Sequence, residues 1–323
     1  MQGAGPAMMR VFVYEHLSGG GAADASAELL SAGREMRDAV VQDLLRAGDC
    51  VVSAAAGPHA PQVPVPARAV GPPPAGSAAD FLAQQAAIHD LVWVIAPESD
   101  GVLAQLRHVV HAEHWLGCDA ASIALTSSKR ATLVHAAKHG LMTPLAFTGS
   151  PQTCRWVVKP DDGAGAVATQ VHDTHAAACV DADARWQRGE SVVLEAWVEG
   201  EPMSLSLLSN AGWIELLCVN RQQLAIDAAG VLSFVGVQID ALQHNDPRIG
   251  ALRIWARTLA NAIPGLRGYV GVDLVWHPQH GPVLIEINPR VTMAYVGLSE
   301  RLDHNLAASV IAAHHRETNH AAA

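Results

Sequence analysis

The sequence predicts an α/β protein, with a Rossmann-like lobe of parallel strands first and a more β-rich, α+β part after it. Two patterns favour this fold class. In the first third of the chain, short aliphatic runs alternate with segments of helical spacing, which is typical of a parallel sheet covered by helices. From Arg155 to Asn220, aliphatic runs separated by turns predominate instead. The 323 residues are half hydrophobic, which is enough for two or three packed lobes.

The N-terminal lobe, residues 9–120, is expected to contain three strands with helices between and after them. The aliphatic runs have the length of buried strands and cover residues 10–14, 50–54 and 91–95. The segments with helical spacing cover residues 27–47, 77–90 and 101–115. The proline-rich segment 57–76 is predicted to be a loop. No Gly-x-Gly-x-x-Gly follows the first strand, which argues against a dinucleotide site and an NAD(P)-dependent oxidoreductase.

The rest of the chain is expected to form a small subdomain, 121–195, a large subdomain, 196–316, and a polar tail, 317–323. Ser127 is a suitable N-cap for a helix over 128–139, which Gly140 would end. Two more helices are predicted near the C-terminus, over 247–262 and around 305–315.

Composition excludes several classes of protein. No apolar run approaches the ~20 residues of a membrane span, and no basic stretch precedes a hydrophobic segment at the N-terminus. The five cysteines are scattered, which is typical of reduced thiols. The net charge of −10 without a basic cluster argues against a nucleic-acid partner. We therefore expect a cytoplasmic protein without nucleic-acid or membrane partners; the oligomeric state stays open, a homodimer included.

Two carboxylates lie within the last two aliphatic runs of the sequence. Asp273 lies in the first run, and Glu286 and Asn288 lie in the second. A turn with Pro and Gly separates the runs, so a hairpin is predicted. Because strand side chains alternate, Glu286 and Asn288 share one face while Ile285 and Ile287 face a core. The hairpin can bring Asp273 to the face of Glu286.

These oxygen-bearing side chains predict a cation site. Converging carboxylates repel each other unless a cation joins them, and hard oxygen ligands suit Mg²⁺, which Mn²⁺ can replace. Arg290 follows shortly after and can bind a phosphate oxygen with its guanidinium fork. The alternative is a polar stripe that faces solvent.

Lysine usage singles out two further residues. The chain has 21 basic residues, and Lys129, Lys138 and Lys159 are its lysines. Lys138 is predicted to be an ordinary charge in the last turn of a helix. Lys159 ends a strand and precedes a glycine loop, where Gly163 and Gly165 would let backbone N–H groups approach phosphate oxygens. A tight hairpin is the alternative for this loop, since Gly-Lys-Ser/Thr is absent.

Two polar residues in the β-rich part allow either a structural or a binding role. Glu195 interrupts an apolar run, and Arg221 follows an aliphatic strand. Glu195 fits an edge strand, and Arg221 fits the surface. In a nucleotide site, the Glu195 carboxylate or the neighbouring backbone would accept from the adenine amino group, and Arg221 would face a phosphate.

The turn after the first strand is a candidate substrate site. Ligands of open α/β sheets bind outside the carboxyl ends of strands. Glu15 could attract an ammonium group there, while Ser18, Gly19 and Gly20 belong to a glycine turn whose N–H groups could meet a carboxylate. A plain flexible turn is the alternative.

Taken in order, these segments resemble the ATP-grasp superfamily. The matching pieces run from Lys129 through Lys159–Gly165 and Glu195–Gly200 to Asp273 and Glu286–Arg290. The unmatched N-terminal lobe resembles the Rossmann-like lobe of such enzymes. The resemblance therefore implies an ATP-grasp fold with ATP bound between two lobes.

The resemblance also implies roles for individual residues. It assigns contacts with the ATP phosphates and the loop that covers them to Lys129, Lys159, Gly163 and Gly165. It assigns the adenine edge to Glu195, Ala196 and Val198, and Mg²⁺ to Asp273, Glu286 and Asn288. It places Lys159 and Arg290 against the transferring phosphoryl group. Glu201 is the candidate ribose ligand, but it directly follows Gly200, whereas the family's ribose acid commonly lies three to four residues after the hinge.

The activity implied is that of an ADP-forming, Mg²⁺-dependent carboxylate–amine ligase that works through an acyl phosphate. A narrower resemblance is to the tyramine–glutamate ligases of methanofuran biosynthesis and their bacterial relatives. It rests on Val13–Gly21, Ile95–Glu98 and Val219–Gln222, and it implies glutamate and an aromatic amine or amino acid as substrates. The alternatives are a dipeptide ligase similar to D-alanine–D-alanine ligase and a nucleotide-binding regulatory module without turnover.

Overall fold

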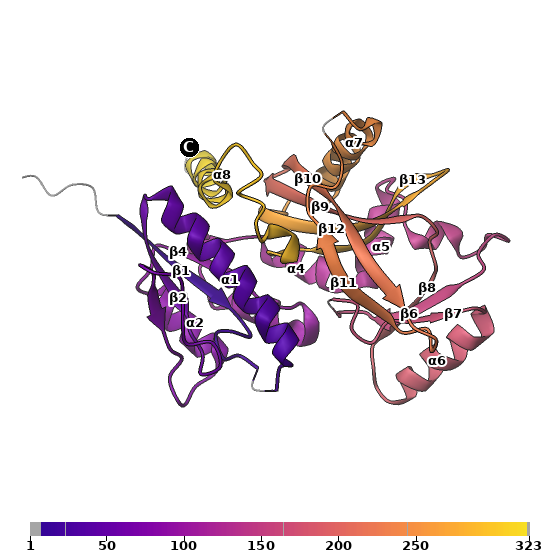
Figure 1. Cartoon of the computed structure of the whole chain (residues 1–323), viewed down its shortest axis with the longest axis horizontal. Helices are drawn as coiled ribbons and strands as arrows, with labels where there is room; N and C mark the ends of the chain where they lie inside the picture. The colour runs from indigo at the N-terminus through magenta and orange to yellow at the C-terminus, as the bar shows by residue number, and fades with distance from the viewer. Residues whose placement is uncertain (1–7, 23, 164, 244, 322–323) are drawn as a thin grey trace, which may run out of the picture. The chain divides into compact units, whose positions relative to one another are not determined.

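The computed structural model describes residues 8–22, 24–163, 165–243 and 245–321, which form two compact units (Figure 1). The first unit comprises the described residues up to Ala96, Val102–Ala120 and those from Arg290 onward. The second unit comprises Pro97–Gly101 and Ala121–Pro289. Each unit has its own sheet core.

The first unit contains a five-stranded sheet in the order β3-β2-β1-β4-β5, with every pair of neighbours parallel. The strands are β1 (Met9–Glu15), β2 (Cys50–Ala55), β3 (Arg68–Val70), β4 (Leu91–Ile95) and β5 (Trp115–Leu116). Its helices are α1 (Ala27–Ala47), α2 (Ala78–Ala86), α3 (Val102–His108) and α8 (Leu306–Ala321). The parallel sheet is confirmed, and β1 and β4 are buried along almost their whole length because helices cover the sheet.

Several helix bounds follow from local capping. Helix α1 has the predicted bounds: the side chain of Ser26 accepts from the Leu29 N–H, and Gly48 adopts the left-handed conformation at its end. The helix predicted over 101–115 is wrong in its second half, because α3 ends at His108 and β5 begins at Trp115. The segment predicted as a loop over 57–76 contains the edge strand β3, whose pairing with β2 is a tertiary contact.

The second unit has two antiparallel sheets. The three-stranded sheet has the order β7-β6-β8, from Gln170–His172, Trp156–Pro160 and Val192–Ala196. The five-stranded sheet has the order β11-β10-β9-β12-β13, from Leu232–Gln238, Trp213–Ile226, Glu201–Asn210, Gly268–His277 and Gly281–Asn288. Helix α6 (His175–Gln187) packs through Ala178 and Ala182 on one face of the small sheet. This helix was not predicted within the β-rich segment.

The remaining helices of the second unit differ partly from the prediction. Helix α7 (Pro247–Ala262) has the predicted bounds. The helix predicted over 128–139 is preceded by α4 (Ala120–Ser127), and α5 runs over Lys129–Lys138. Ser127 is therefore wrong as the N-cap: Ser128 is the cap, and its side chain accepts from the Ala131 N–H.

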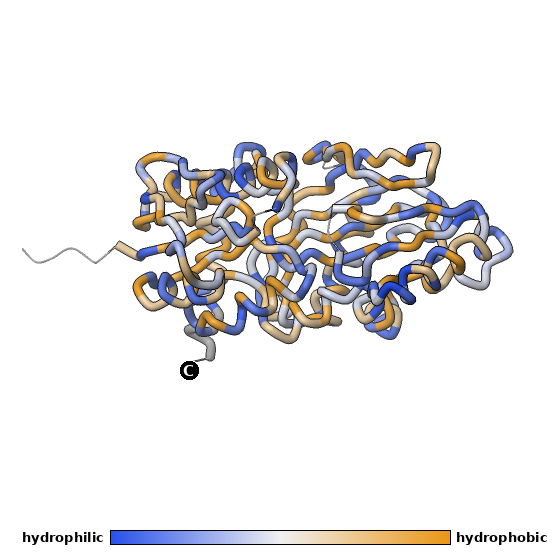
Figure 2. Tube along the Cα trace, turned by 90° about the horizontal axis from the view of Figure 1, so that it is seen from below, coloured by the Kyte–Doolittle hydropathy of each residue, from blue (hydrophilic) through white to orange (hydrophobic). Residues whose placement is uncertain are grey.

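None of the described helices is long and apolar enough to cross a membrane. Figure 2 shows hydrophobic and hydrophilic residues interspersed along the tube in both units.

Candidate active site

The predicted hairpin is confirmed and brings the three proposed metal ligands together. Strand β12 pairs with β13 so that Asp273 lies opposite Glu286 and Gly271 opposite Asn288. The Asn288 amide nitrogen donates to Asp273 Oδ2 at 3.3 Å. Ile287 is buried as predicted, but Ile285 is only partly buried, because the register shifts at a β-bulge beside it.

Lys129 reaches the same hairpin from the first residue of α5. Its ammonium lies 3.2 Å from Glu286 Oε2 and donates to the carbonyl oxygen of Gly163. Asp161 fixes the start of this helix, since its carboxylate accepts from the Ser128 hydroxyl and from the Arg130 N–H, each at 2.8 Å. A cation at a helix N-terminus opposes the helix dipole, so a buried lysine here needs compensation, and Glu286 supplies it.

Lys159 and Glu195 form a second buried ion pair on the three-stranded sheet. Lys159 Nζ lies 2.9 Å from Glu195 Oε2, and the two side chains are 8% and 6% exposed. Glu195 Oε1 is buried and has no hydrogen-bond partner among the described residues. A buried carboxylate oxygen without a donor is costly, so this atom suits a ligand that brings an N–H group.

The electrostatics keep Glu286 ionised. Burial alone would raise the pKa of its carboxyl, but the charges of Lys129 and Lys159, with hydrogen bonds, lower it below the ordinary value. Two carboxylates and one amide, all hard oxygen donors, therefore fit a Mg²⁺-type cation. The described residues contain no group of three or more His, Cys, Asp and Glu side chains suited to a metal, so the amide of Asn288 is needed for a three-ligand site.

The glycine loop after β6 is anchored on two sides. Asp161 binds the start of α5, as described above, and Asp162 accepts from the backbone N–H of Asp100 at 2.9 Å. The Ser99 hydroxyl donates to the carbonyl of Asp162 at 3.2 Å. Gly165 has a φ of +66°, which favours glycine. The base of the loop is thus held by side chains, and the roles of Gly163 and Gly165 at phosphate stay predictions.

The proposed adenine edge leads from β8 into β9. Ala196 and Val198 are buried. The Arg155 guanidinium lies 4.7 Å from the ring centre of Trp197, and the backbone N–H of Trp197 donates to the Arg155 carbonyl. This packing fixes the backbone between the two sheets.

Glu201 lies between two arginines at the start of β9. Its Oε1 lies 2.5 Å from Arg221 Nη2, and its Oε2 lies 2.7 Å from Arg248 Nη1. Burial would raise the pKa of Glu201, but the hydrogen bonds from both arginines lower it overall. Arg221 thus points to Glu201, and the proposed ribose role of Glu201 and substrate role of Arg221 stay predictions.

The sequence interpretation missed Gln222, the residue after Arg221. Its side-chain amide donates to Asp273 Oδ1 at 2.9 Å. Strand alternation places Gln222 and Arg221 on opposite faces, which is a signal present in the sequence. The missing information was the strand order, which places β10 one strand away from β12, on the other side of β9.

The proposed substrate turn is in the first unit. Glu15 is buried, and its carboxylate accepts from the N–H groups of Leu17 and Ser18 at 3.1 and 2.7 Å. Burial raises the pKa of Glu15. The expectation of free N–H groups is wrong: those of Gly19 and Gly20 donate to the carbonyls of Glu15 and Leu17. The carboxylate is thus engaged in its own turn, and its contact with a substrate ammonium stays a prediction.

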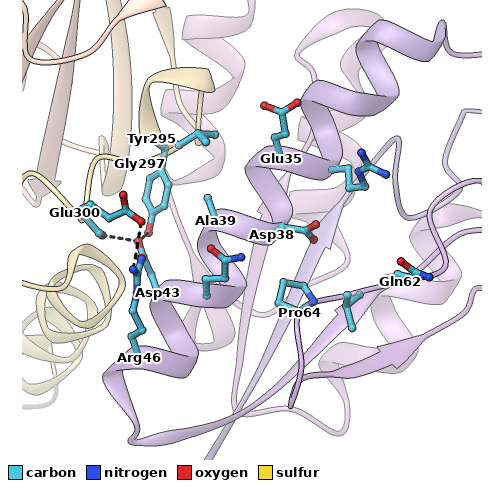
Figure 3. A pocket seen from close by; sticks show the side chains of 15 residues that line it. Glu35, Asp38, Ala39, Asp43, Arg46, Gln62, Pro64, Tyr295, Gly297 and Glu300 are labelled. Atoms are coloured by element: carbon cyan, nitrogen blue, oxygen red, sulfur yellow. Dashed lines mark hydrogen bonds and ion pairs between the residues drawn. The ribbon is translucent and has the colours of Figure 1, made fainter.

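A groove of about 720 Å³ lies elsewhere in the first unit, between α1, the loop around 62–64 and the segment 295–300 (Figure 3). Its lining includes none of the predicted site residues. At one end the buried Asp43 accepts from the hydroxyls of Tyr295 and Ser299 and from Arg46, which fastens the C-terminal segment to α1. Arg290 is the first residue of the C-terminal part of this unit, and it donates to the Val291 carbonyl at 3.2 Å. Its role at a phosphoryl group stays a prediction.

Comparison with known families assigns the chain. A family model described as an ATP-grasp domain matches residues 126–294, more than half of the chain. This chain belongs to the ATP-grasp family. A second model, described as a pre ATP-grasp 3 domain, matches residues 50–123 of this ATP-grasp protein.

Solved structures share the fold of this ATP-grasp protein at low sequence identity. A protein from Archaeoglobus fulgidus, provisionally assigned to the ATP-grasp superfamily, is 19% identical with a TM-score of 0.70 over 94% of this chain and 88% of its own. The L-amino acid ligase from Bacillus licheniformis is 16% identical, with a TM-score of 0.66 over 94% and 73%. The D-alanine–D-alanine ligase from Bacillus anthracis complexed with ATP is 14% identical, with a TM-score of 0.64 over 97% and 99%.

A search of curated proteins found no match to this ATP-grasp protein. The narrower resemblance to tyramine–glutamate ligases therefore stays a prediction.

Proposed function

We propose that this ATP-grasp protein is an ATP- and Mg²⁺-dependent ligase that joins a carboxylate to an amine and forms ADP. One observation carries the proposal: Asp273 and Glu286 lie opposite each other on a hairpin, the ammonium of the buried Lys129 lies 3.2 Å from Glu286 Oε2, and Lys159 is a second buried lysine of the same unit. Such an arrangement of fixed positive charge and ionised oxygen ligands suits a metal-bound triphosphate. The membership of the ATP-grasp family supports ATP and a divalent metal as cofactors.

The reaction follows the chemistry of such a site. A carboxylate oxygen of the substrate attacks the γ-phosphorus of ATP, and the bond from that phosphorus to the β–γ bridging oxygen breaks and releases ADP. The amine nitrogen then attacks the carbonyl carbon of the acyl phosphate, loses a proton, and expels inorganic phosphate. The metal neutralises charge on the phosphate oxygens when it is bound. In the proposed assignment, Lys129 and Lys159 stabilise the same oxygens and Arg290 faces the transferred group.

For the substrates we propose an amino-acid carboxylate, with glutamate as the first candidate, and an aromatic amine or amino acid as acceptor. This choice rests on the resemblance of the turn after β1 and of the segments 95–98 and 219–222. A dipeptide ligase is the second candidate. The similarity of nearly the whole chain to proteins named as an L-amino acid ligase and a D-alanine–D-alanine ligase favours it.

The deciding experiment is ADP formation measured with pairs of carboxylates and amines, with glutamate plus tyramine or tyrosine tested first and D-alanine or L-amino acid pairs next. We expect ADP release that requires both substrates and a divalent metal, and that Glu286→Ala abolishes. ATP binding without turnover for any pair would favour a regulatory module instead. Activity with alanine pairs but not with glutamate would select the dipeptide ligase.

A further inference from the structure

Both oxygens of the Asp273 carboxylate accept hydrogen bonds from neutral amides. Gln222 Nε2 donates to Oδ1 at 2.9 Å, and Asn288 Nδ2 donates to Oδ2 at 3.3 Å. Asn288 is itself a proposed metal ligand, but Gln222 comes from a different part of the sheet. We propose that Gln222 is a positioning residue that orients Asp273 toward the metal ion of the nucleotide. This inference rests on the proposed function, because it assumes that Asp273 binds a metal.

The order of the strands explains how Gln222 reaches Asp273. Strand β9 lies between β10, which carries Gln222, and β12, which carries Asp273. In the row of paired residues across these strands, Ser204 lies between Asn220 and Asp273. A serine in this row is short, so a longer side chain from β10 can pass over β9 and meet the carboxylate.

Near this contact, strands β10, β9 and β12 carry buried polar side chains that hydrogen-bond one another. Asn220 is fully buried and donates to the hydroxyls of Ser204 and Ser206 at 3.3 and 3.2 Å. The Ser206 hydroxyl lies 2.9 Å from the hydroxyl of Tyr269. Buried polar groups that bond one another hold a single arrangement. Asn220 and Gln222 are two residues apart on β10, so their side chains share a face of the sheet. Because the hydrogen bonds of Asn220 hold β10 in place, they also fix the backbone position from which the Gln222 side chain extends.

The chemistry favours an amide in this position. A carboxylate oxygen can accept about two hydrogen bonds or ligands, so Oδ1 keeps capacity for a metal after binding Gln222. A lysine or arginine at the same place would add a positive charge and oppose the cation. An amide donor restricts rotation of Asp273 without that penalty, and partners of metal ligands typically contribute about 10- to 100-fold to metal affinity.

The test uses Gln222→Met, which keeps side-chain length but removes the donor, and Gln223→Met as the matched control. Gln223 is the next residue on β10, is exposed, and faces away from Asp273. Mn²⁺ is titrated into the full-length protein with a non-hydrolysable ATP analogue bound, and bound Mn²⁺ is followed by electron paramagnetic resonance. Gln222→Ala is measured in parallel, with circular dichroism to verify folding, and Asp273→Ala reports on the metal site itself.

We expect Gln222→Met and Gln222→Ala to weaken Mn²⁺ binding by about tenfold or more. The affinity of these variants for the nucleotide without metal should stay within about twofold of the wild-type value. A general loss of structure would weaken both metal binding and nucleotide binding. The control should match the wild type. If Asp273→Ala binds Mn²⁺ at least tenfold more weakly while both Gln222 variants match the wild type, the positioning role is overturned and the metal site stands. If Asp273→Ala also matches the wild type, the metal site and the inference are both overturned.

Discussion

Replacing Lys129 with methionine tests the electrostatic core of the site. The Lys129 side chain is 9% exposed and Glu286 17%, and their charged atoms are 3.2 Å apart. Removing one partner of a fully buried pair costs about 3–5 kcal/mol, because the other charge stays buried. Lys159 still acts on Glu286 and some solvent reaches it, so we expect a loss of about 2–3 kcal/mol in the free energy of unfolding near pH 7.

The pH dependence of this loss identifies its cause. In the wild type the pKa of Glu286 is below its ordinary value of 4.5, so its stabilising effect is present above about that pH and is lost as pH falls through the folded pKa. Without Lys129 the folded pKa rises, so protonation relieves the buried charge at higher pH. The difference between variant and wild type should therefore shrink from about pH 7 to about pH 4.

Urea titration of Lys129→Met, the wild type and Lys138→Met at both pH values provides the assay. Lys138 lies exposed in the last turn of the same helix, so its replacement should change stability by no more than about 0.5 kcal/mol. A Lys129→Met protein as stable as the control near pH 7, or a loss that is equal at both pH values, would refute the reasoning. Isothermal titration calorimetry should also show that Lys129→Met binds ATP more weakly than the wild type, whereas Lys138→Met binds it equally well.

Three further changes test separate parts of the molecule. Asp273→Ala should lower turnover about 100-fold or more with an unchanged circular dichroism spectrum, and phosphate release measures it; near-normal turnover would remove Asp273 from the metal site. Glu201→Gln should cost about 1 kcal/mol near pH 7. Since the pKa of Glu201 is lowered, this difference should vanish as pH falls below about 4.5 in urea titrations, and a constant difference would contradict the ion-pair account. Asp43→Ala leaves the hydroxyls of Tyr295 and Ser299 without their acceptor and should cost about 2–4 kcal/mol, whereas Glu35→Ala should be nearly neutral by the same assay.

Features that depend on residues close together in the sequence could be predicted from the sequence alone. The aliphatic runs of the first unit became parallel strands, and the helix over 27–47 has cap residues at both ends. The closing hairpin was predicted because a turn separates two alternating runs, and alternation placed Glu286 and Asn288 on one face. The rarity of lysine in the sequence singled out Lys129 and Lys159, and in the structure each of them forms an ion pair with a glutamate.

Local patterns were insufficient where short segments carried competing signals. Helix α6 has few large apolar residues, and alanines make its buried face, so its periodicity is weak. The strand β3 gains its partner only from β2 in the folded sheet. The bulge beside Ile285 shifts the alternation by one residue and leaves this side chain partly exposed.

The sequence by itself determined which residues we propose for a metal and a triphosphate, because strand period and turn residues act over a few positions. Only the tertiary structure decided their partners. It paired Arg221 with Glu201, and it brought Gln222 to Asp273 across an intervening strand. The physical reason is that a hydrogen bond between distant residues depends on strand order and register. These are set by packing of the whole sheet, which a local pattern does not encode.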